Sequence, residues 1–263
     1  MAEIILPITS VVIFGSGNVA THLGKAFAQT GITIQQVYSR NQAHANELAN
    51  ITHSVAITEP GKADTNADLW IISVSDDAIK KIIDHLPPYD GIVVHTAGSV
   101  AMETLSQFQH FGVFYPFQTL SKEREINHND LPLLVEGSDP STTQRLLNLA
   151  SQISNKVTIA DSGLRATLHI AAVLSCNFVN HLYTLSADLL GKNNISFDFL
   201  MPLIKETTQK ILSMPPADAQ TGPAIRNDQS VIEKHLIRLS DNPSLKKIYD
   251  LMSKSIIQYH NKQ

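Results

Sequence analysis

The sequence predicts an α/β fold in which a doubly wound, mostly parallel sheet is followed by an all-helical domain. Three observations predict this fold. Short apolar runs alternate with helical patterns from residue 11 to about residue 160. A glycine-rich turn directly follows the first apolar run, and after residue 160 only helical patterns continue. We therefore expect two domains, residues 1–160 and residues 161–263.

The composition of the 263-residue chain is that of an ordinary globular protein, with 43% hydrophobic and 17% charged residues. Its net charge of −4, with no basic run, argues against a nucleic-acid partner. The single cysteine excludes an internal disulfide framework and a cysteine-rich zinc site. No segment reaches the roughly 18 apolar residues of a membrane span, and the N-terminus lacks the basic-then-apolar pattern expected of a signal sequence. We therefore expect a cytoplasmic protein without a membrane partner.

The first strand and the turn after it match the dinucleotide-binding pattern Gly-x-Gly-x-x-Ala. The apolar run at residues 11–14 predicts a buried strand. Gly15 allows a tight turn, Gly17 lets a pyrophosphate approach the backbone, and Ala20 lets the following helix pack closely on the strand. The N-terminus of that helix would hold the phosphate charge. The alternative is a tight turn with a purely structural role.

The second predicted strand, residues 32–38, ends at Ser39 and Arg40, where the type of cofactor is decided. Enzymes that prefer NAD place an acidic residue here, about 20 residues past the glycines, to bind the ribose hydroxyls. A hydroxyl and a guanidinium suit a 2′-phosphate instead, through charge-assisted hydrogen bonds. We therefore expect NADP(H) in preference to NAD(H), unless Arg40 is a solvated loop residue.

Polar loops follow the later strands of the predicted sheet. Those strands are expected at residues 54–57, 69–74, 91–95, 111–115, 133–136 and 156–160. Because ligands sit at the carboxyl ends of strands in such sheets, the loops 73–76, 95–99 and 115–118 should meet at the glycine-rich turn. The residues expected to bind the cofactor are Gly15, Ser16, Gly17, Asn18, Val19, Ala20, Ser39, Arg40, Val74, Ser75, Asp76, Thr96, Ala97, Gly98 and Ser99.

The helical half begins with residues 164–190. This stretch contains no proline and no glycine, which predicts one long helix. The stretch 170–176 is apolar nearly all round, so we expect the helix to be buried. Four-residue spacing places His169, Val173, Asn177 and His181 along one stripe. A polar stripe on a buried helix is a hydrogen-bonded core network or an active-site wall. Next to a cofactor crevice, we expect the second role for His169 and Asn177.

Three more helices are predicted at residues 198–212, 229–239 and 244–260, the last of them capped by Ser244. The loop at residues 221–228 (TGPAIRND) leads into the middle one. It is either a capping turn with a local salt bridge or an anion clamp. In the clamp, Arg226 contacts a substrate carboxylate and Asp228 holds the guanidinium.

Five segments carry a resemblance to known proteins: residues 14–23, 95–99, 115–118, 169–181 and 221–228. A dinucleotide fold followed by helices resembles the superfamily of pyrroline-5-carboxylate reductase, 6-phosphogluconate dehydrogenase and ketopantoate reductase. The chain is more closely similar to a bacterial Rossmann-like family with a C-terminal domain of unknown function. The resemblance implies an NADP-dependent oxidoreductase that reduces a small carbonyl or imine, such as the 2-keto acid ketopantoate. It also implies a homodimer formed through the helical domain.

One departure from the superfamily concerns the proton donor. Hydroxyacid dehydrogenases and ketopantoate reductase use a lysine on the first long helix after the sheet, but this chain has no lysine between Lys156 and Lys192. His169 takes the place, and a histidine titrates in the useful range. Asn177 would hold the carbonyl oxygen.

The missing lysine also supports a second hypothesis, a non-catalytic dinucleotide-sensing protein on the same fold. A third class, a metal-dependent hydrolase, has no support, because the eleven histidines are scattered without a metal-ligand spacing. We therefore expect no metal.

Overall fold

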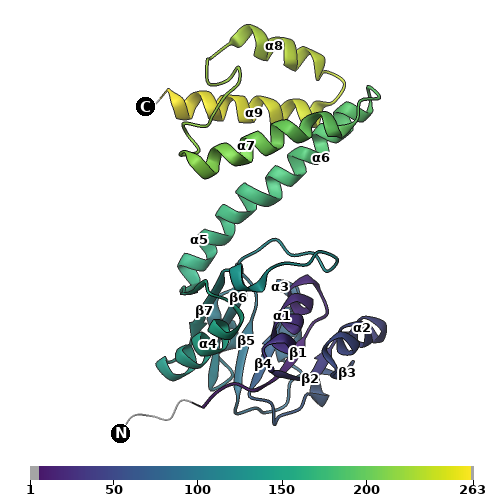
Figure 1. Cartoon of the computed structure of the whole chain (residues 1–263), viewed down its shortest axis with the longest axis vertical. Helices are drawn as coiled ribbons and strands as arrows, with labels where there is room; N and C mark the ends of the chain where they lie inside the picture. Colours follow the sequence, from purple (N-terminus) through teal and green to yellow (C-terminus); the bar gives the residue numbers. More distant parts are fainter. Residues whose placement is uncertain (1–5, 262–263) are drawn as a thin grey trace. The chain divides into compact units, whose positions relative to one another are not determined.

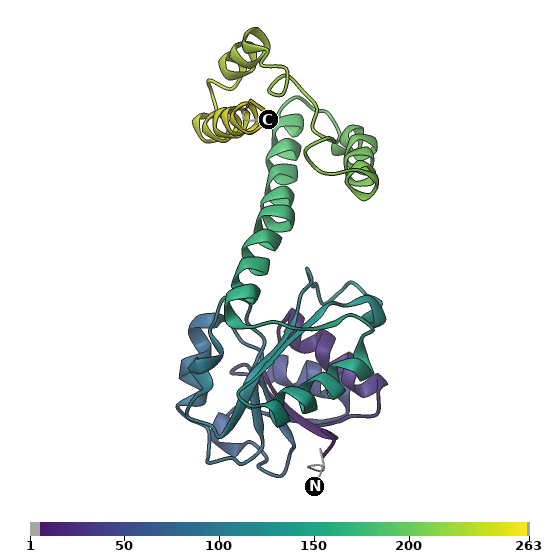
Figure 2. The same ribbon diagram turned by 90° about the vertical axis from the view of Figure 1, so that its left-hand side faces the viewer.

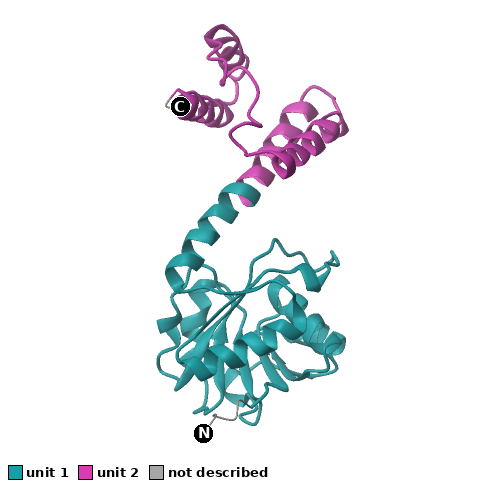
Figure 3. Cartoon of the chain, turned by 60° about the vertical axis from the view of Figure 1, so that its left-hand side comes forward, with its two compact units in different colours: residues 1–176 teal, residues 177–263 magenta. Residues whose placement is uncertain are grey.

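The structure, a computed structural model, describes residues 6–261. They belong to two compact units, residues 1–176 and 177–263, coloured separately in Figure 3. The first helix beyond residue 160, α5 (Ser162–Ala172), is grouped with the first unit. The functional boundary expected at residue 160 stays a prediction.

The first unit is built on one eight-stranded sheet in the order β3-β2-β1-β4-β5-β6-β7-β8. Each pair of neighbours is parallel except β6 and β7. The strand order reverses between β1 and β4, which is the switch point of a doubly wound sheet. The predicted fold class is confirmed. The strands are β1 (Ser10–Phe14), β2 (Thr33–Tyr38), β3 (Val55–Ile57), β4 (Leu69–Ile72), β5 (Ile92–His95), β6 (His110–Pro116), β7 (Leu133–Gly137) and β8 (Val157–Ile159).

Helices cover both faces of this sheet (Figures 1 and 2). Successive side chains of a strand point to opposite faces, so Val11 and Ile13 pack with α1, α2 and α4, whereas Val12 and Phe14 pack with α3. All four residues are fully buried, which fixes β1 at the centre of the unit. The helices are α1 (Asn18–Gln29), α2 (Gln42–Thr52), α3 (Asp76–Ile83) and α4 (Pro140–Ile153).

The long helix predicted after the sheet consists of α5, one π-turn (Val173–Asn177) and α6 (Phe178–Gly191). The π-turn interrupts the four-residue spacing on which the predicted polar stripe rests. The expected burial is wrong, since Ile170, Leu174 and Phe178 are 62%, 56% and 55% exposed. An all-round apolar pattern predicts that something covers a helix, but it does not say that the same chain does so.

The second unit continues with η5 (Phe197–Leu200), α7 (Met201–Ser213), α8 (Gln229–Arg238) and α9 (Pro243–His260). The predicted cap Ser244 is wrong, because the side chain of Asn242 accepts the N–H of Leu245 instead. Pro243, with its fixed φ, starts the helix before Ser244. Within residues 6–261, no helix is both long and apolar enough to span a membrane.

Candidate active site

The turn between β1 and α1 requires a glycine at its first position. Gly15 has φ +131°, and a Cβ there would lie 2.0 Å from the carbonyl oxygen of Ser73. The N–H of Gly15 donates to the carbonyl of Tyr38 at 2.8 Å. The turn therefore touches both neighbours of β1, and a larger residue would force the sheet apart.

The second glycine of the turn is not required by packing. A Cβ on Gly17, the N-cap of α1, would meet no heavy atom within 4 Å. Among the described residues, no side chain caps this helix end and no acidic residue occupies its first turn. Its free N–H groups and helix dipole therefore suit an anion. Ala20 is fully buried beneath the turn, as close helix–strand packing requires.

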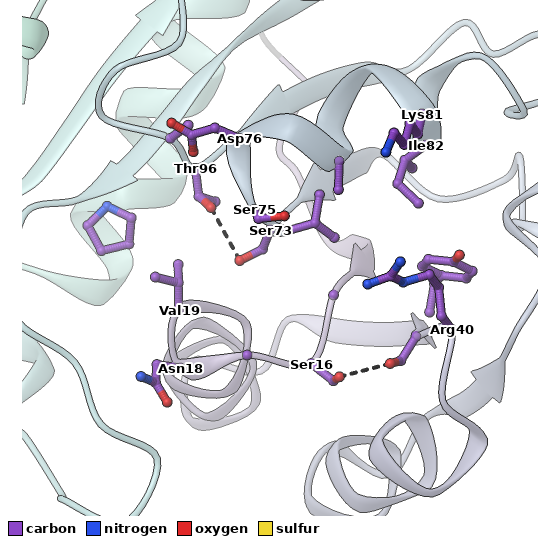
Figure 4. Close-up of a pocket in the computed structure, with 18 of the residues that line it drawn as sticks. Ser16, Asn18, Val19, Arg40, Ser73, Ser75, Asp76, Lys81, Ile82 and Thr96 are labelled. Atoms are coloured by element: carbon purple, nitrogen blue, oxygen red, sulfur yellow. Dashed lines mark hydrogen bonds between the residues drawn. The ribbon is translucent and has the colours of Figure 1, made fainter.

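A cavity of about 820 Å³ opens over this turn (Figure 4). Its walls come from the carboxyl ends of β1, β2, β4, β5 and β6, together with α3 and α5, so the predicted convergence of loops is present. Ala20 and Ser99 do not line it. The predicted cofactor residues that do are Gly15, Ser16, Gly17, Asn18, Val19, Ser39, Arg40, Val74, Ser75, Asp76, Thr96, Ala97 and Gly98.

Hydroxyl groups tie these loops to one another. Ser16 Oγ donates to Ser39 Oγ at 3.0 Å, and Thr96 Oγ1 donates to Ser73 Oγ at 3.2 Å, as the dashed lines in Figure 4 show. Ser99 Oγ donates to the carboxylate of Asp76. Ser99 therefore holds a cavity residue without reaching the cavity itself.

Two cations stand at one end of the cavity. Arg40 and Lys81 lie on the same side of Figure 4, away from Asp76 and Thr96. In the described part of the chain, neither cation takes part in an ion pair. An exposed guanidinium and ammonium without partners suit a phosphate.

Lys81 and two histidines of this end, His44 and His85, are absent from the sequence prediction. All three are exposed residues of helices or their ends, a pattern typical of a solvated helix face. Nothing local in the sequence distinguishes them from other exposed helix residues, because the strand order brings their helices to this end of the cavity.

A hydrogen-bonded pair forms another part of the wall. The hydroxyl of Tyr115, on β6, lies 3.0 Å from Nδ1 of His169, on α5. A Cβ on Gly98 would lie 2.6 Å from that nitrogen and 2.9 Å from Cζ of Tyr115. The loop after β5 thus passes directly against both side chains. His169 lines the cavity as expected, whereas the sequence singles out Tyr115 only as part of a loop.

A buried ion pair fixes the helix that carries His169. Arg165 is 1% exposed and donates to the carboxylate of Glu136 on β7. It also donates to the carbonyl of Val100 at 2.7 Å and to Ser162 Oγ at 3.1 Å. Because residues four apart share a helix face, this network anchors the turn of α5 next to His169. The sequence prediction misses Arg165.

Burial shifts two pKa values around the pair. Burial and the charge of Asp76 raise the pKa of Tyr115, against the opposing effect of Arg165. Burial and Arg165 lower the pKa of His95 to about 4, so this side chain at the end of β5 is neutral. The N–H of Ala97 donates to its Nδ1 at 3.2 Å, and Nε2 faces the carbonyl of Ala101 at 3.4 Å. His95 therefore shapes the loop that carries Gly98.

Three predicted site residues belong to the second unit. Asn177 ends the π-turn and is exposed. Asp228 caps α8, accepting the N–H of Val231 at 3.3 Å. Arg226 is exposed and, within residues 6–261, forms no ion pair with Asp228. The capping role is thus present without the local salt bridge, and a role in anion binding stays a prediction.

Within the described part of the chain, no three side chains of the metal-binding types come together. The cavity offers backbone N–H groups, cations and a tyrosine–histidine pair. That chemistry suits a phosphorylated organic ligand and a proton transfer.

Two family descriptions match the sequence. Residues 10–98 match the family described as NADP oxidoreductase coenzyme F420-dependent. Residues 131–256 match the family described as a domain of unknown function, DUF2520. No curated protein matches the chain.

Solved structures similar to the whole chain also exist. BF3122 from Bacteroides fragilis, a candidate NADP oxidoreductase, is 42% identical, with 95% of this chain and 98% of that chain covered and a TM-score of 0.89. An imine reductase from Myxococcus stipitatus in complex with NADP⁺ is 15% identical over 96% of this chain and 94% of that one, with a TM-score of 0.67. A reductive aminase from Aspergillus terreus with NADPH and ethyl levulinate is 18% identical over 88% and 78%, with a TM-score of 0.59. The likeness to the last two concerns the fold.

Proposed function

Because the chain belongs to the family of Rossmann-fold NADP oxidoreductases that carry a DUF2520 domain, we propose that it reduces a small carbonyl or imine compound with NADPH. Ketopantoate and other 2-keto acids are the first substrates to test. One observation carries the proposal. A single cavity joins an uncapped helix N-terminus and unpaired cations to a hydrogen-bonded tyrosine and histidine.

The residues present fit a dinucleotide. The space above Gly17 and the free N–H groups of α1 suit a pyrophosphate, and a Cβ at position 17 would intrude on it. Arg40, with Ser39 beside it, suits a 2′-phosphate, and Lys81 adds a second positive charge. These groups favour NADPH over NADH. When bound, NADPH supplies the hydride.

His169 is the proposed source of the proton that the reduced substrate needs. It lines the cavity, and its ring is held by Tyr115. A positioned acid contributes about two to four orders of magnitude in rate. The absence of a lysine from residues 157–191 therefore does not deprive the site of a proton donor.

Asn177, Arg226 and Asp228 are proposed substrate-binding residues. The exposed amide of Asn177 would hold the substrate's oxygen, and the unpaired guanidinium of Arg226 would bind a carboxylate. Asp228 would act by fixing the turn through its cap on α8. Arg226→Ala should weaken binding of 2-keto acids and leave reduction of uncharged imines unchanged.

A homodimer is proposed through the helical unit. Large apolar side chains of α6 and α7 are exposed, including Phe178, Leu203 and Leu212. Exposed apolar surface of this extent marks a protein contact. A second copy would cover this surface, including the part on α6 that belongs to the helix predicted to be buried.

The test is NADPH oxidation by the purified protein against a panel of 2-keto acids and cyclic imines. We expect turnover with at least one class, faster with NADPH than with NADH. Saturable NADP⁺ binding with no turnover on any compound would support the dinucleotide-sensing alternative.

A further inference from the structure

We infer that Tyr115 hands the proton to the substrate and that His169 replaces it, so that the two side chains form a two-step relay. The inference rests on the proposed reduction and names the atom that delivers the proton. It also gives Gly98 a role, as the residue that leaves room for the pair.

The geometry makes the two side chains one unit. The Tyr115 hydroxyl and His169 Nδ1 are 3.0 Å apart, a normal hydrogen-bond length. Both side chains line the cavity, and the backbone of Gly98 passes against them. Any Cβ at position 98 would displace one or both partners.

One proton lies between the Tyr115 oxygen and His169 Nδ1. Which of the two atoms carries it decides whether Tyr115 can give a proton to a substrate. If the hydroxyl donates to Nδ1, the tyrosine proton is engaged and unavailable to a substrate. If His169 is protonated, Nδ1–H donates to the phenol oxygen instead. The phenolic O–H is then free to point into the cavity, and only this arrangement delivers a proton from Tyr115.

The phenol alone cannot complete the transfer. Burial and Asp76 raise the pKa of Tyr115, so a tyrosinate left behind is disfavoured. The charges that bear on the phenol come from Asp76 on α3 and Arg165 on α5, while His95 on β5 is neutral. Return of the Nδ1 proton from His169 removes the tyrosinate as it forms.

For a ketone, the carbonyl carbon would receive the hydride that NADPH supplies, with NADP⁺ as the oxidised product. The carbon–oxygen π bond breaks, and the oxygen takes the proton of the Tyr115 hydroxyl. The phenol oxygen takes the Nδ1 proton, leaving His169 neutral until water reprotonates it. For an imine, nitrogen replaces oxygen as the proton acceptor.

Arg165 preorganises the relay without joining it. Its bonds to Glu136 and to the carbonyl of Val100 tie α5 to β7 and to the loop of Gly98. Arg165 is therefore a positioning residue for His169. Edge-on contact of the Tyr115 ring with Phe117, at 6.1 Å between centroids, steadies the other partner.

Three variants test the relay. Tyr115→Phe removes the hydroxyl and keeps the ring. His169→Asn keeps a nitrogen donor near the position of Nδ1 and cannot titrate. Tyr249→Phe is the matched control, because Tyr249 makes the same kind of bond to Nδ1 of His235, at 2.7 Å, outside the cavity.

The first readout is independent of activity. In cofactor-free protein at one fixed pH, the NMR resonances of the His169 ring should move in Tyr115→Phe and stay in place in Tyr249→Phe. Unmoved His169 resonances in Tyr115→Phe would overturn the pairing, whether or not a substrate has been found.

The second readout is turnover. We expect Tyr115→Phe and His169→Asn each to lose about 10²–10⁴-fold in kcat, and the double variant to lose no more than the worse single variant. Wild-type kcat should fall as the pH rises, because the relay needs a protonated histidine, and His169→Asn should lack that fall. Full activity of Tyr115→Phe beside an inactive His169→Asn would make His169 the direct donor and overturn the relay. A wild-type protein that reduces nothing would refute the proposed function, while the NMR result still decides the pair.

Discussion

The two units differ in how completely they bury their own apolar residues. In the first unit, the central strands β4 and β5 are fully buried, as is β1 from Val11 onward. The buried guanidinium of Arg165 is paired with Glu136. In the second unit, the buried apolar residues within the described range are Ala224, Ile232 and Leu239. Several leucines and a phenylalanine of α6 and α7 are exposed in this unit. The first unit therefore has an extensive core of its own and leaves apolar side chains of α5 and the π-turn exposed, whereas the second unit buries few apolar side chains in this structure.

The two units also differ in how the side chains of their proposed site residues are held. Cavity residues of the first unit are held by bonds within it, such as Ser16 to Ser39 and Tyr115 to His169. Asn177 and Arg226 of the second unit are exposed. We therefore expect some substitutions in the first unit to change mainly its stability, and others to change mainly cofactor binding.

The largest effect is expected at Arg165. Arg165→Met leaves the Glu136 carboxylate without its ion-pair partner, which costs about 3–5 kcal/mol in the free energy of unfolding. Urea denaturation, followed by a signal from the first unit, measures this loss of unfolding free energy. Arg165→Met combined with Glu136→Leu should recover part of the loss, because no unpaired charge remains. The exposed Arg238, in the second unit, provides the control, since Arg238→Met should change stability by at most about 0.5 kcal/mol.

The two glycines of the turn should separate folding from binding. Gly15→Ala places a methyl group against the Ser73 carbonyl at positive φ and should cost about 3 kcal/mol or more. Gly17→Ala meets open space, so its melting temperature should match the wild type while NADP⁺ affinity falls at least about tenfold. Equal losses of stability in the two variants would contradict the assignment of Gly17 to the pyrophosphate.

Acid should destabilise the first unit through His95. Its folded pKa of about 4 lies below the unfolded value near 6.5, so the unfolded state binds more protons between these values. Its contribution is fully present above about pH 6.5 and is lost as the pH falls toward 4, by up to about 3 kcal/mol. His128, whose pKa is lowered by burial and His22, acts in the same direction. The difference in unfolding free energy between pH 7 and pH 4.5, measured by denaturation, should therefore be smaller in His95→Asn than in the wild type.

Arg40 should set cofactor preference. If Arg40 binds the 2′-phosphate as proposed, Arg40→Ala would remove a charge-assisted bond worth about 1.5–3 kcal/mol, so NADP⁺ should bind about 10–100-fold more weakly. NAD⁺ affinity should stay the same, because NAD⁺ lacks that phosphate. Calorimetric titration with both nucleotides checks it. Equal weakening for the two would place Arg40 elsewhere on the cofactor.

The smallest stability effect in a single chain should come from the second unit. Leu212, on α7, is 82% exposed, so Leu212→Asp should change the unfolding free energy of a monomer by at most about 0.5 kcal/mol. If a second copy covers it, the dimer dissociation constant should rise about tenfold or more. Sedimentation equilibrium distinguishes the two, and an unchanged monomeric mass in both proteins would refute the proposed dimer.

Local signals made the first unit predictable. The turn at Gly15 and the position of Arg40 follow from spacing along the chain, and the strand order then brings the loops together. The Tyr115–His169 contact joins residues 54 apart and has no local signature. Arg165 lies in a helical pattern whose burial depends on β7. The exposure of Phe178 on α6 could not be predicted either, because the apolar pattern of a helix does not specify what packs against it.

The proposed NADP site is tested most directly by adding NADP⁺ to the histidine-labelled wild-type protein and following the His169 resonance by NMR. We expect saturable binding that moves this resonance, because in the proposed site the reactive end of the cofactor would reach the wall formed by His169, Tyr115 and Gly98. A folded protein that binds no NADP⁺, or binds it with the His169 resonance unmoved, would contradict the proposed site.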